Sequence, residues 1–142
     1  MTLQWPASSP SDNPGMSFTI YHNARCSNSR GALALLNAAG ITPVVVDYMA
    51  TPPSAATLTQ LLHDAGLTAR ELIRSKEAAY AELGLDRPEL DDVALIEAMC
   101  GHPALINRPL VSSPVGTLLC RPPERVQMLI DAFLAQSTEG AR

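Results

Sequence analysis

The chain has 142 residues, of which 46% are hydrophobic, and this is enough to build one domain around a hydrophobic core. Its formal net charge of −4 and the lack of a long basic run argue against nucleic acid as a partner. No apolar run approaches the roughly 20 residues that span a bilayer, so we expect a soluble protein without a membrane partner.

The cysteines point to a reducing compartment. Cys26, Cys100 and Cys120 are spaced too widely for a metal motif or for the disulfide framework of a small secreted protein. We therefore expect a cytoplasmic protein.

The two ends of the chain differ in composition from the rest. Residues 1–15 are rich in proline and serine, and they lack the basic start and long apolar core of a signal peptide. We expect a disordered tail over residues 1–15, one domain over residues 16–136 and a flexible C-terminus over residues 137–142. Met16 is an alternative start of translation, and the sequence leaves the choice between Met1 and Met16 open.

The first part of the domain shows a strand, a helix and a second strand. Residues 17–21 form an apolar run typical of a buried strand, and residues 31–39 have the composition of a helix that ends at Gly40. Residues 43–48 are rich in β-branched side chains and indicate a second strand. Because a helix connects the two strands, we expect them to be parallel.

The middle third of the chain is predicted to be helical. Ser54 is a suitable N-cap for the amphipathic segment that follows it, and Thr68 and Glu71 have the spacing of a capping box. The acidic pair at 91–92 opens a further helix, which we expect to run through Met99.

The last third predicts a hairpin and a closing helix. Residues 104–112 and 117–120 flank a Ser-Pro-Val-Gly turn, and apolar residues at helical spacing follow Arg121. The order of elements is strand, helix, strand, helical insertion, hairpin and helix. It predicts an α/β fold with a thioredoxin-like four-stranded mixed sheet and a helical insertion after the second strand.

Cys26 stands between the first predicted strand and the first predicted helix, where a thiol can become reactive. The unpaired amides and the positive end of the helix dipole favour a thiolate there, and His22, Arg25 and Arg30 add positive charge. The same donors would bind an oxyanion. Ser29 occupies the third position after the cysteine, so a local Cys-x-x-Cys disulfide is impossible.

Several blocks of sequence resemble the glutaredoxin-linked arsenate reductase family, in order, over residues 17–129. The blocks are Tyr-His-Asn-x-x-Cys-Ser-x-Ser-Arg from Tyr21, Thr-Pro-Pro-Ser from Thr51, Arg74 after Glu-Leu-Ile, Leu-Ile-Asn-Arg-Pro-Leu-Val from Leu105, and Cys-Arg-Pro from Cys120. The family usually has proline two residues before the cysteine, where this chain has Ala24.

The resemblance implies an enzyme that reduces arsenate on a thioredoxin-like fold. It places the nucleophile on Cys26 and the neighbouring histidine on His22. Three arginines would surround the oxyanion, and they fall on Arg74, Arg108 and Arg121. Glutathione would be the co-substrate and glutaredoxin the partner that resolves the mixed disulfide, with no bound cofactor or metal.

Some assignments remain open at the level of sequence. Ser29 and Arg30 are candidate substrate-binding residues or simply residues of the helix start. Cys120 is either structural or a resolving thiol. The thioredoxin-like plan also predicts a cis peptide bond between Arg108 and Pro109.

Two other functions are compatible with this fold. One is a redox-sensing transcription regulator that binds RNA polymerase, although such regulators typically carry a Cys-x-x-Cys that Ser29 removes here. The other is a general glutathione-dependent thiol oxidoreductase, which has little reason to gather three arginines around its cysteine. Arsenate reduction is therefore the leading hypothesis.

Overall fold

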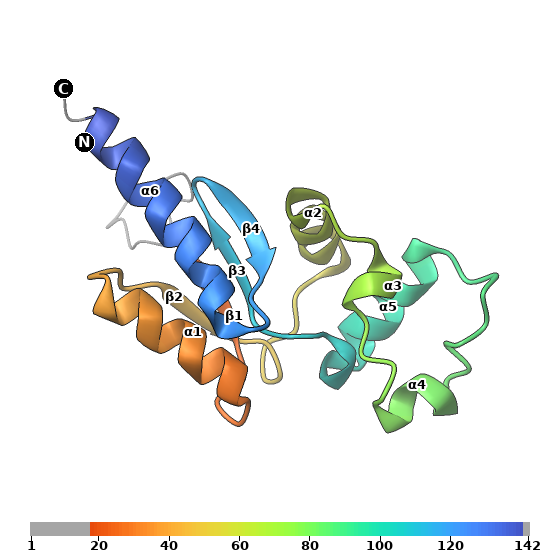
Figure 1. Ribbon diagram of the computed structural model, residues 1–142. Coiled ribbons are helices and arrows are strands. Elements are labelled where there is room, and N and C mark those ends of the chain that lie inside the picture. Colours follow the sequence, from red (N-terminus) through yellow and green to blue (C-terminus); the bar gives the residue numbers. More distant parts are fainter. Residues whose placement is uncertain (1–17, 141–142) are drawn as a thin grey trace, which may run out of the picture.

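The computed structural model describes residues 18–140 (Figure 1). The predicted N-terminal tail, residues 1–15, and the last two residues of the predicted flexible C-terminus lie outside this range. Among residues 18–140, no helix combines the length and apolar character that crossing a membrane requires.

The centre of the fold is a four-stranded mixed sheet in the order β2-β1-β3-β4. Its strands are β1 (Thr19–His22), β2 (Val44–Asp47), β3 (Leu110–Ser113) and β4 (Gly116–Leu119). β1 runs parallel to β2 and antiparallel to β3, and β3 pairs with β4 as a hairpin. The predicted four-stranded mixed sheet, with its first two strands parallel and its last two in an antiparallel hairpin, is confirmed.

Helices lie on both sides of this sheet (Figure 1). They are α1 (Ser27–Ala38), α2 (Ala55–Ala65), α3 (Ala69–Leu72), α4 (Ala78–Glu82), α5 (Asp92–Gly101) and α6 (Val126–Gly140), with short 3-10 helices η3 (Pro103–Leu105) and η4 (Pro123–Arg125). The predicted helical insertion after the second strand is the segment α2 to α5.

Two hydrophobic clusters attach the helices to opposite faces of the sheet. Ile20 and Val111 pack with buried residues of α1 and α6, whereas Leu110 and Tyr21 pack with those of the insertion. Neighbouring residues of a strand point to opposite faces, so each central strand contributes to both clusters. The sheet is thus the middle layer of three.

The predicted helix starts in the insertion are confirmed. The Ser54 hydroxyl accepts a hydrogen bond from the Thr57 N–H. Thr68 and Glu71 form a reciprocal capping box, and the Asp91 carboxylate caps α5. Short polar side chains satisfy the unpaired amides of a helix start, which is why these positions could be located from sequence.

Two predicted boundaries are wrong. α1 begins at Ser27 rather than at residue 31, because the Cys26 carbonyl already accepts the Arg30 N–H at 3.0 Å. The strand expected over residues 104–112 begins only at Leu110. The residues before it form η3 and an irregular segment that ends at Pro109, which has no N–H to donate to a sheet. The Arg108–Pro109 peptide bond is cis, as predicted.

The capping box at Thr68 gives a stability prediction. Thr68→Ala removes the acceptor for the Glu71 N–H, and we expect the free energy of unfolding to fall by about 1 kcal/mol in urea denaturation. Thr59→Ala is the control, because the Thr59 hydroxyl only donates to the Ala55 carbonyl within exposed helix. Alanine favours helix there, so a change below about 0.5 kcal/mol is expected. Equal losses in both variants would contradict the role of the cap.

Candidate active site

Cys26 lies at the N-cap position of α1, after a tight turn that follows β1. Its N–H donates to the Asn23 carbonyl at 2.9 Å, and the Asn23 side-chain oxygen accepts the Arg25 N–H at 2.9 Å. The side-chain Nδ2 of Asn23 donates to the hydroxyl of Tyr48, which is a fully buried residue. The turn around the cysteine is therefore anchored to the core.

The surroundings of Cys26 favour the thiolate. The residue is 8% exposed, and burial, the largest single effect, acts to raise the pKa of the thiol. The N–H groups of Ser29 and Asn28, together with the hydrogen bond and charge of Arg108, outweigh burial and lower this pKa below its usual value. A helix start beside a guanidinium thus favours the thiolate at Cys26, whose reactivity stays a prediction.

The buried Ser29 and the partly buried His22 form a pair at the helix start. The Ser29 hydroxyl is fully buried, accepts the Asn23 N–H at 3.0 Å and lies 2.6 Å from Nδ1 of His22. Burial lowers the pKa of His22, the charge of Asp47 opposes this, and the charge of Arg30 adds to it. A neutral imidazole can accept the Ser29 O–H, so the pair fixes the turn whose amides face the thiol.

Two arginines flank the thiol. The Arg121 Nη1 lies 3.8 Å from the Cys26 Sγ and donates to the Arg108 carbonyl at 3.0 Å. The Arg108 guanidinium also contacts the thiol, while its Nε is buried without a hydrogen-bond partner in the described part of the chain. The Nε of Arg108 is therefore a buried donor that the described residues leave unsatisfied.

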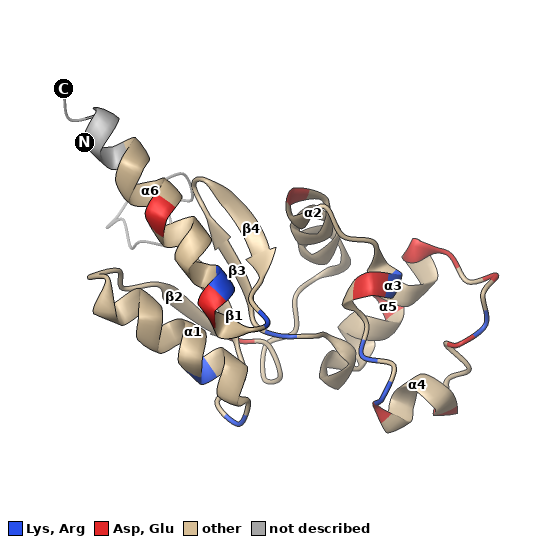
Figure 2. Cartoon of the chain, viewed as in Figure 1, with Lys and Arg blue, Asp and Glu red and all other residues tan. Residues whose placement is uncertain are grey.

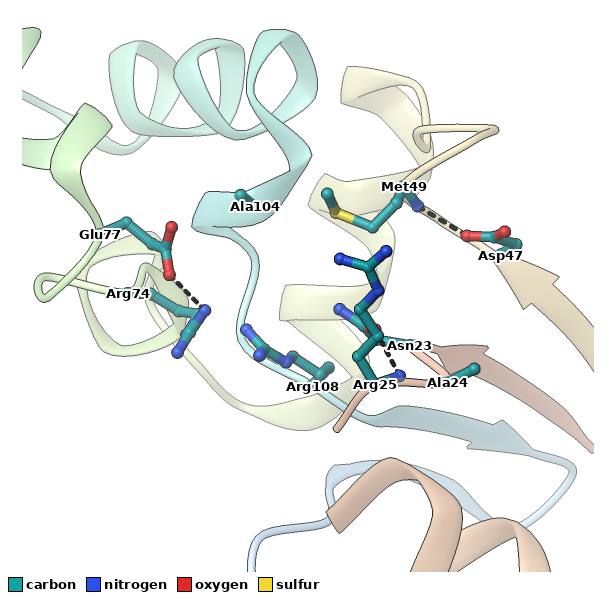
Figure 3. A pocket seen from close by; sticks show the side chains of 9 residues that line it. All are labelled: Asn23, Ala24, Arg25, Asp47, Met49, Arg74, Glu77, Ala104 and Arg108. Atoms are coloured by element: carbon teal, nitrogen blue, oxygen red, sulfur yellow. Dashed lines mark hydrogen bonds and ion pairs between the residues drawn. The ribbon is translucent and has the colours of Figure 1, made fainter. Parts of the chain in front are cut away.

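A cavity of about 480 Å³ lies beside these residues (Figure 3). Its lining consists of Asn23, Ala24, Arg25, Asp47, Met49, Arg74, Glu77, Ala104 and Arg108. Three of these side chains are arginines and two are carboxylates. Cys26 is not part of the lining, but Arg108 touches both the thiol and the cavity and so connects them.

The structure brings most predicted site residues together and leaves one aside. Arg74 and Arg108 line the cavity, Arg121 touches the thiol, and His22 reaches it only through Ser29. The exposed Arg30 instead donates from Nη1 to the Ala24 carbonyl at 2.8 Å and does not line the cavity. Its contact supports the turn, and its substrate-binding role stays a prediction.

Other lining residues were not recognised from sequence. Glu77 forms an ion pair with Arg74, and Asp47 caps the turn after β2 by accepting the N–H groups of Met49 and Ala50. The signals that could have located them are the spacing of three between Arg74 and Glu77 and the position of Asp47 at the end of β2, opposite His22.

The other two thiols have different surroundings. Cys120 is fully buried, and burial raises its pKa to about 12 although the charge of Arg125 opposes this. Burial and the charge of Glu97 raise the pKa of the half-buried Cys100. Among the three thiols, only that of Cys26 has a lowered pKa, so Cys26 is the low-pKa thiol of this site.

The fold and the site together define a class of protein. The sheet is thioredoxin-like, a thiol with a lowered pKa starts its first helix, and guanidinium groups gather beside that thiol. Such proteins use a cysteine next to a bound anion or a mixed disulfide.

The chain belongs to the ArsC family, whose family model matches residues 21–129. It is 52% identical to the arsenate reductase of Rhizobium meliloti strain 1021 over 111 residues, which covers 78% of this chain and 79% of that protein. It is 44% identical to the arsenate reductase of Escherichia coli K12 over 115 residues, or 80% of this chain and 82% of that protein.

A solved structure shows the same fold. The arsenate reductase from Vibrio cholerae superimposes with a TM-score of 0.77 at 46% identity, over 80% of this chain and 97% of that one. The resemblance of the sequence blocks to this family is thereby confirmed.

The buried hydroxyl of Ser29 gives a second prediction. Ser29→Ala leaves the Asn23 N–H without its acceptor, so we expect the free energy of unfolding to fall by about 1–3 kcal/mol. Ser27→Ala is the matched control, because Ser27 is an exposed residue of the same helix turn and should change stability by less than about 0.5 kcal/mol. Urea denaturation of both variants measures the difference. An unchanged free energy of unfolding in Ser29→Ala would contradict a stabilising role for the hydrogen bond between the Asn23 N–H and the Ser29 hydroxyl.

The third prediction concerns the pH dependence of alkylation at Cys26. The thiolate is the reacting form, so the lowered pKa places the rise of the iodoacetamide rate below the pH range of an ordinary cysteine. Arg108→Gln removes a hydrogen bond and a charge that favour the thiolate, and the rise should move to higher pH. Mass spectrometry assigns the modified cysteine.

The control for this experiment is Lys76→Ala, which removes an exposed cation that does not line the cavity. Its pH profile should match that of the unchanged protein. An unshifted profile in Arg108→Gln would show that Arg108 does not stabilise the thiolate.

Proposed function

We propose that the protein is an arsenate reductase that uses the Cys26 thiolate as nucleophile, with glutathione as co-substrate and glutaredoxin as partner. The observation that carries this proposal is the lowered pKa of Cys26 beside the guanidinium groups of Arg108 and Arg121. The arsenate reductases to which the chain is similar support the choice of substrate.

The arginines suit a tetrahedral oxyanion. Guanidinium groups offer paired donors to anionic oxygens and keep their charge, so they neutralise the substrate without taking a proton from the attacking thiol. Arg108 links the thiol to the cavity, and Arg74 lines the cavity beyond it. An anion bound between them would present its central atom to Cys26.

The first chemical step is attack of the thiolate on arsenic. A sulfur–arsenic bond forms, one arsenic–oxygen bond breaks, and the oxygen leaves as water after taking up protons. Arg108 and Arg121 would stabilise the charge on the remaining oxygens. His22 would act as a positioning residue through Ser29.

The second step needs another thiol. Glutathione attacks the sulfur of Cys26, a disulfide forms between them, and the electron pair of the sulfur–arsenic bond stays on arsenic, which leaves as arsenite. Glutaredoxin then releases Cys26 by thiol–disulfide exchange. Overall, arsenate and two thiols give arsenite, a disulfide and water.

The surroundings of the other cysteines support an external reductant. Cys120 is fully buried with a pKa of about 12, and burial and the charge of Glu97 raise the pKa of Cys100. Ser29 occupies the position where a local resolving cysteine would stand. A glutathione pool is a property of a reducing cytoplasm, which is where we place this reaction.

The test is arsenate-dependent oxidation of NADPH in an assay coupled through glutathione, glutathione reductase and glutaredoxin. We expect no turnover for Cys26→Ser and a loss of about 100-fold in kcat/KM for Arg108→Ala, because one donor to the developing charge is removed. Lys76→Ala should retain full activity, since this exposed cation does not line the cavity.

Two further experiments test whether the second thiol is external and which reductant supplies it. Replacing Cys100 by Ser and Cys120 by Ala together should leave turnover nearly unchanged, and a complete loss would favour an internal resolving thiol. Substituting thioredoxin and its reductase for the glutathione system should give little turnover. Activity with thioredoxin alone would correct the proposed reductant, and absence of arsenite with every reductant would overturn the proposed substrate.

A further inference from the structure

We propose that Glu77 makes the arginine-lined cavity selective for oxyanions that still carry a proton, such as hydrogen arsenate and hydrogen phosphate, over fully ionised oxyanions such as sulfate. This inference rests on the proposed function, because it assumes that the cavity binds an oxyanion. It assigns a role to a carboxylate that the mechanism above does not use.

Glu77 is held close to Arg74 at the cavity wall (Figure 3). An oxygen of its carboxylate lies 2.5 Å from the Arg74 Nη1, and the two side chains are 30% and 25% exposed, respectively. The Glu77 N–H donates to the Arg74 carbonyl at 3.2 Å, so both residues belong to one turn of backbone. This turn keeps the two side chains within reach of each other.

A simpler explanation for Glu77 is a surface ion pair at the start of a short helix. Such pairs contribute little to stability, and an acidic residue is common at a helix start. Glu77 is the N-cap residue of α4, but its side chain forms no capping hydrogen bond. Its described side-chain partner is Arg74, and both side chains face the cavity that Arg108 also lines.

This placement has a chemical consequence for any bound anion. An oxyanion held by Arg74 lies next to a carboxylate, which can only accept hydrogen bonds when it is ionised. An oxygen without a proton is repelled by it, whereas a hydroxyl of the anion donates a charge-assisted hydrogen bond. Arsenate and phosphate keep at least one hydroxyl at neutral pH, and sulfate keeps none.

The second carboxylate of the lining, that of Asp47, forms no ion pair among the described residues, and one of its oxygens serves a backbone turn. The Asp47 side chain accepts the N–H groups of Met49 and Ala50 at 3.2 and 3.3 Å, in the turn after β2. Glu77 is therefore the carboxylate that accompanies an anion-binding guanidinium. We expect Glu77 to favour anions that carry a hydroxyl over anions that do not. We do not expect it to raise the affinity for all anions equally.

The experiment measures how anions protect Cys26 from iodoacetamide, at neutral pH, in the full chain. Arg108 touches both the thiol and the cavity, so an anion bound there should slow alkylation. In the unchanged protein, we expect phosphate and arsenate to protect Cys26 and sulfate to protect it only at concentrations at least about tenfold higher.

Glu77→Gln keeps the size of the side chain and removes its charge. We expect sulfate to protect this variant with an affinity at least about tenfold higher than before, while phosphate changes by less than about threefold. Glu77→Asp keeps the charge and should keep most of the discrimination. Glu82→Gln is the matched control, because Glu82 is an exposed residue of the same helix that does not line the cavity.

The outcomes separate this inference from the proposed function. Equal protection by sulfate and phosphate in the unchanged protein, or no gain of sulfate binding in Glu77→Gln, overturns the role of Glu77 and leaves arsenate reduction standing. Protection by phosphate and arsenate with the expected discrimination, but without arsenate turnover, supports Glu77 and overturns the proposed reaction. Lack of protection by every anion overturns both.

Discussion

The site depends on one guanidinium that joins two distant parts of the chain. Arg121 donates to the Arg108 carbonyl and touches the Cys26 sulfur, a residue 95 positions away in sequence. This contact sets the loop before β3 against the start of α1, and it thereby puts the Arg108 side chain beside the thiol. Neither loop alone would form an anion site, because each supplies only part of the charge.

The close packing of α1 against η4 leaves little room for a side chain at position 31. A Cβ at Gly31 would lie 3.1 Å from two side-chain carbons of Pro123, at the start of η4. That is tighter than ordinary packing, and a proline ring has little freedom to move aside. Since Arg121 stands just before η4 in the chain, a larger residue at position 31 would press on the segment that carries this guanidinium.

Local patterns in the sequence predicted the elements whose cause is local. The position of Cys26 between a strand and a helix is set by residues a few positions away. The same is true of the helix cap at Thr68. The assignment of Arg108 and Arg121 to the site rested only on the resemblance to a family. The sequence around a single arginine does not indicate which distant residue it will contact in the fold. The limits of β3 were missed, since Pro109 and the turn before it override the apolar pattern.

The three arginines of the candidate site differ in how many of their donors are already hydrogen-bonded. Arg121 is committed to a carbonyl and the sulfur, and Arg74 is paired with Glu77, whereas the Arg108 Nε is buried without a partner in the described part of the chain. A buried donor without an acceptor is unfavourable, so an oxyanion that reached this Nε, as the proposed function would allow, would remove this cost on binding. Under the proposed function, the same anion would share Arg74 with the Glu77 carboxylate, and this competition would limit how tightly an unprotonated anion binds. Attraction at Arg108 and competition at Arg74 would together favour an anion that both accepts and donates hydrogen bonds, which is the character of the partly protonated oxyanion that we propose Cys26 attacks.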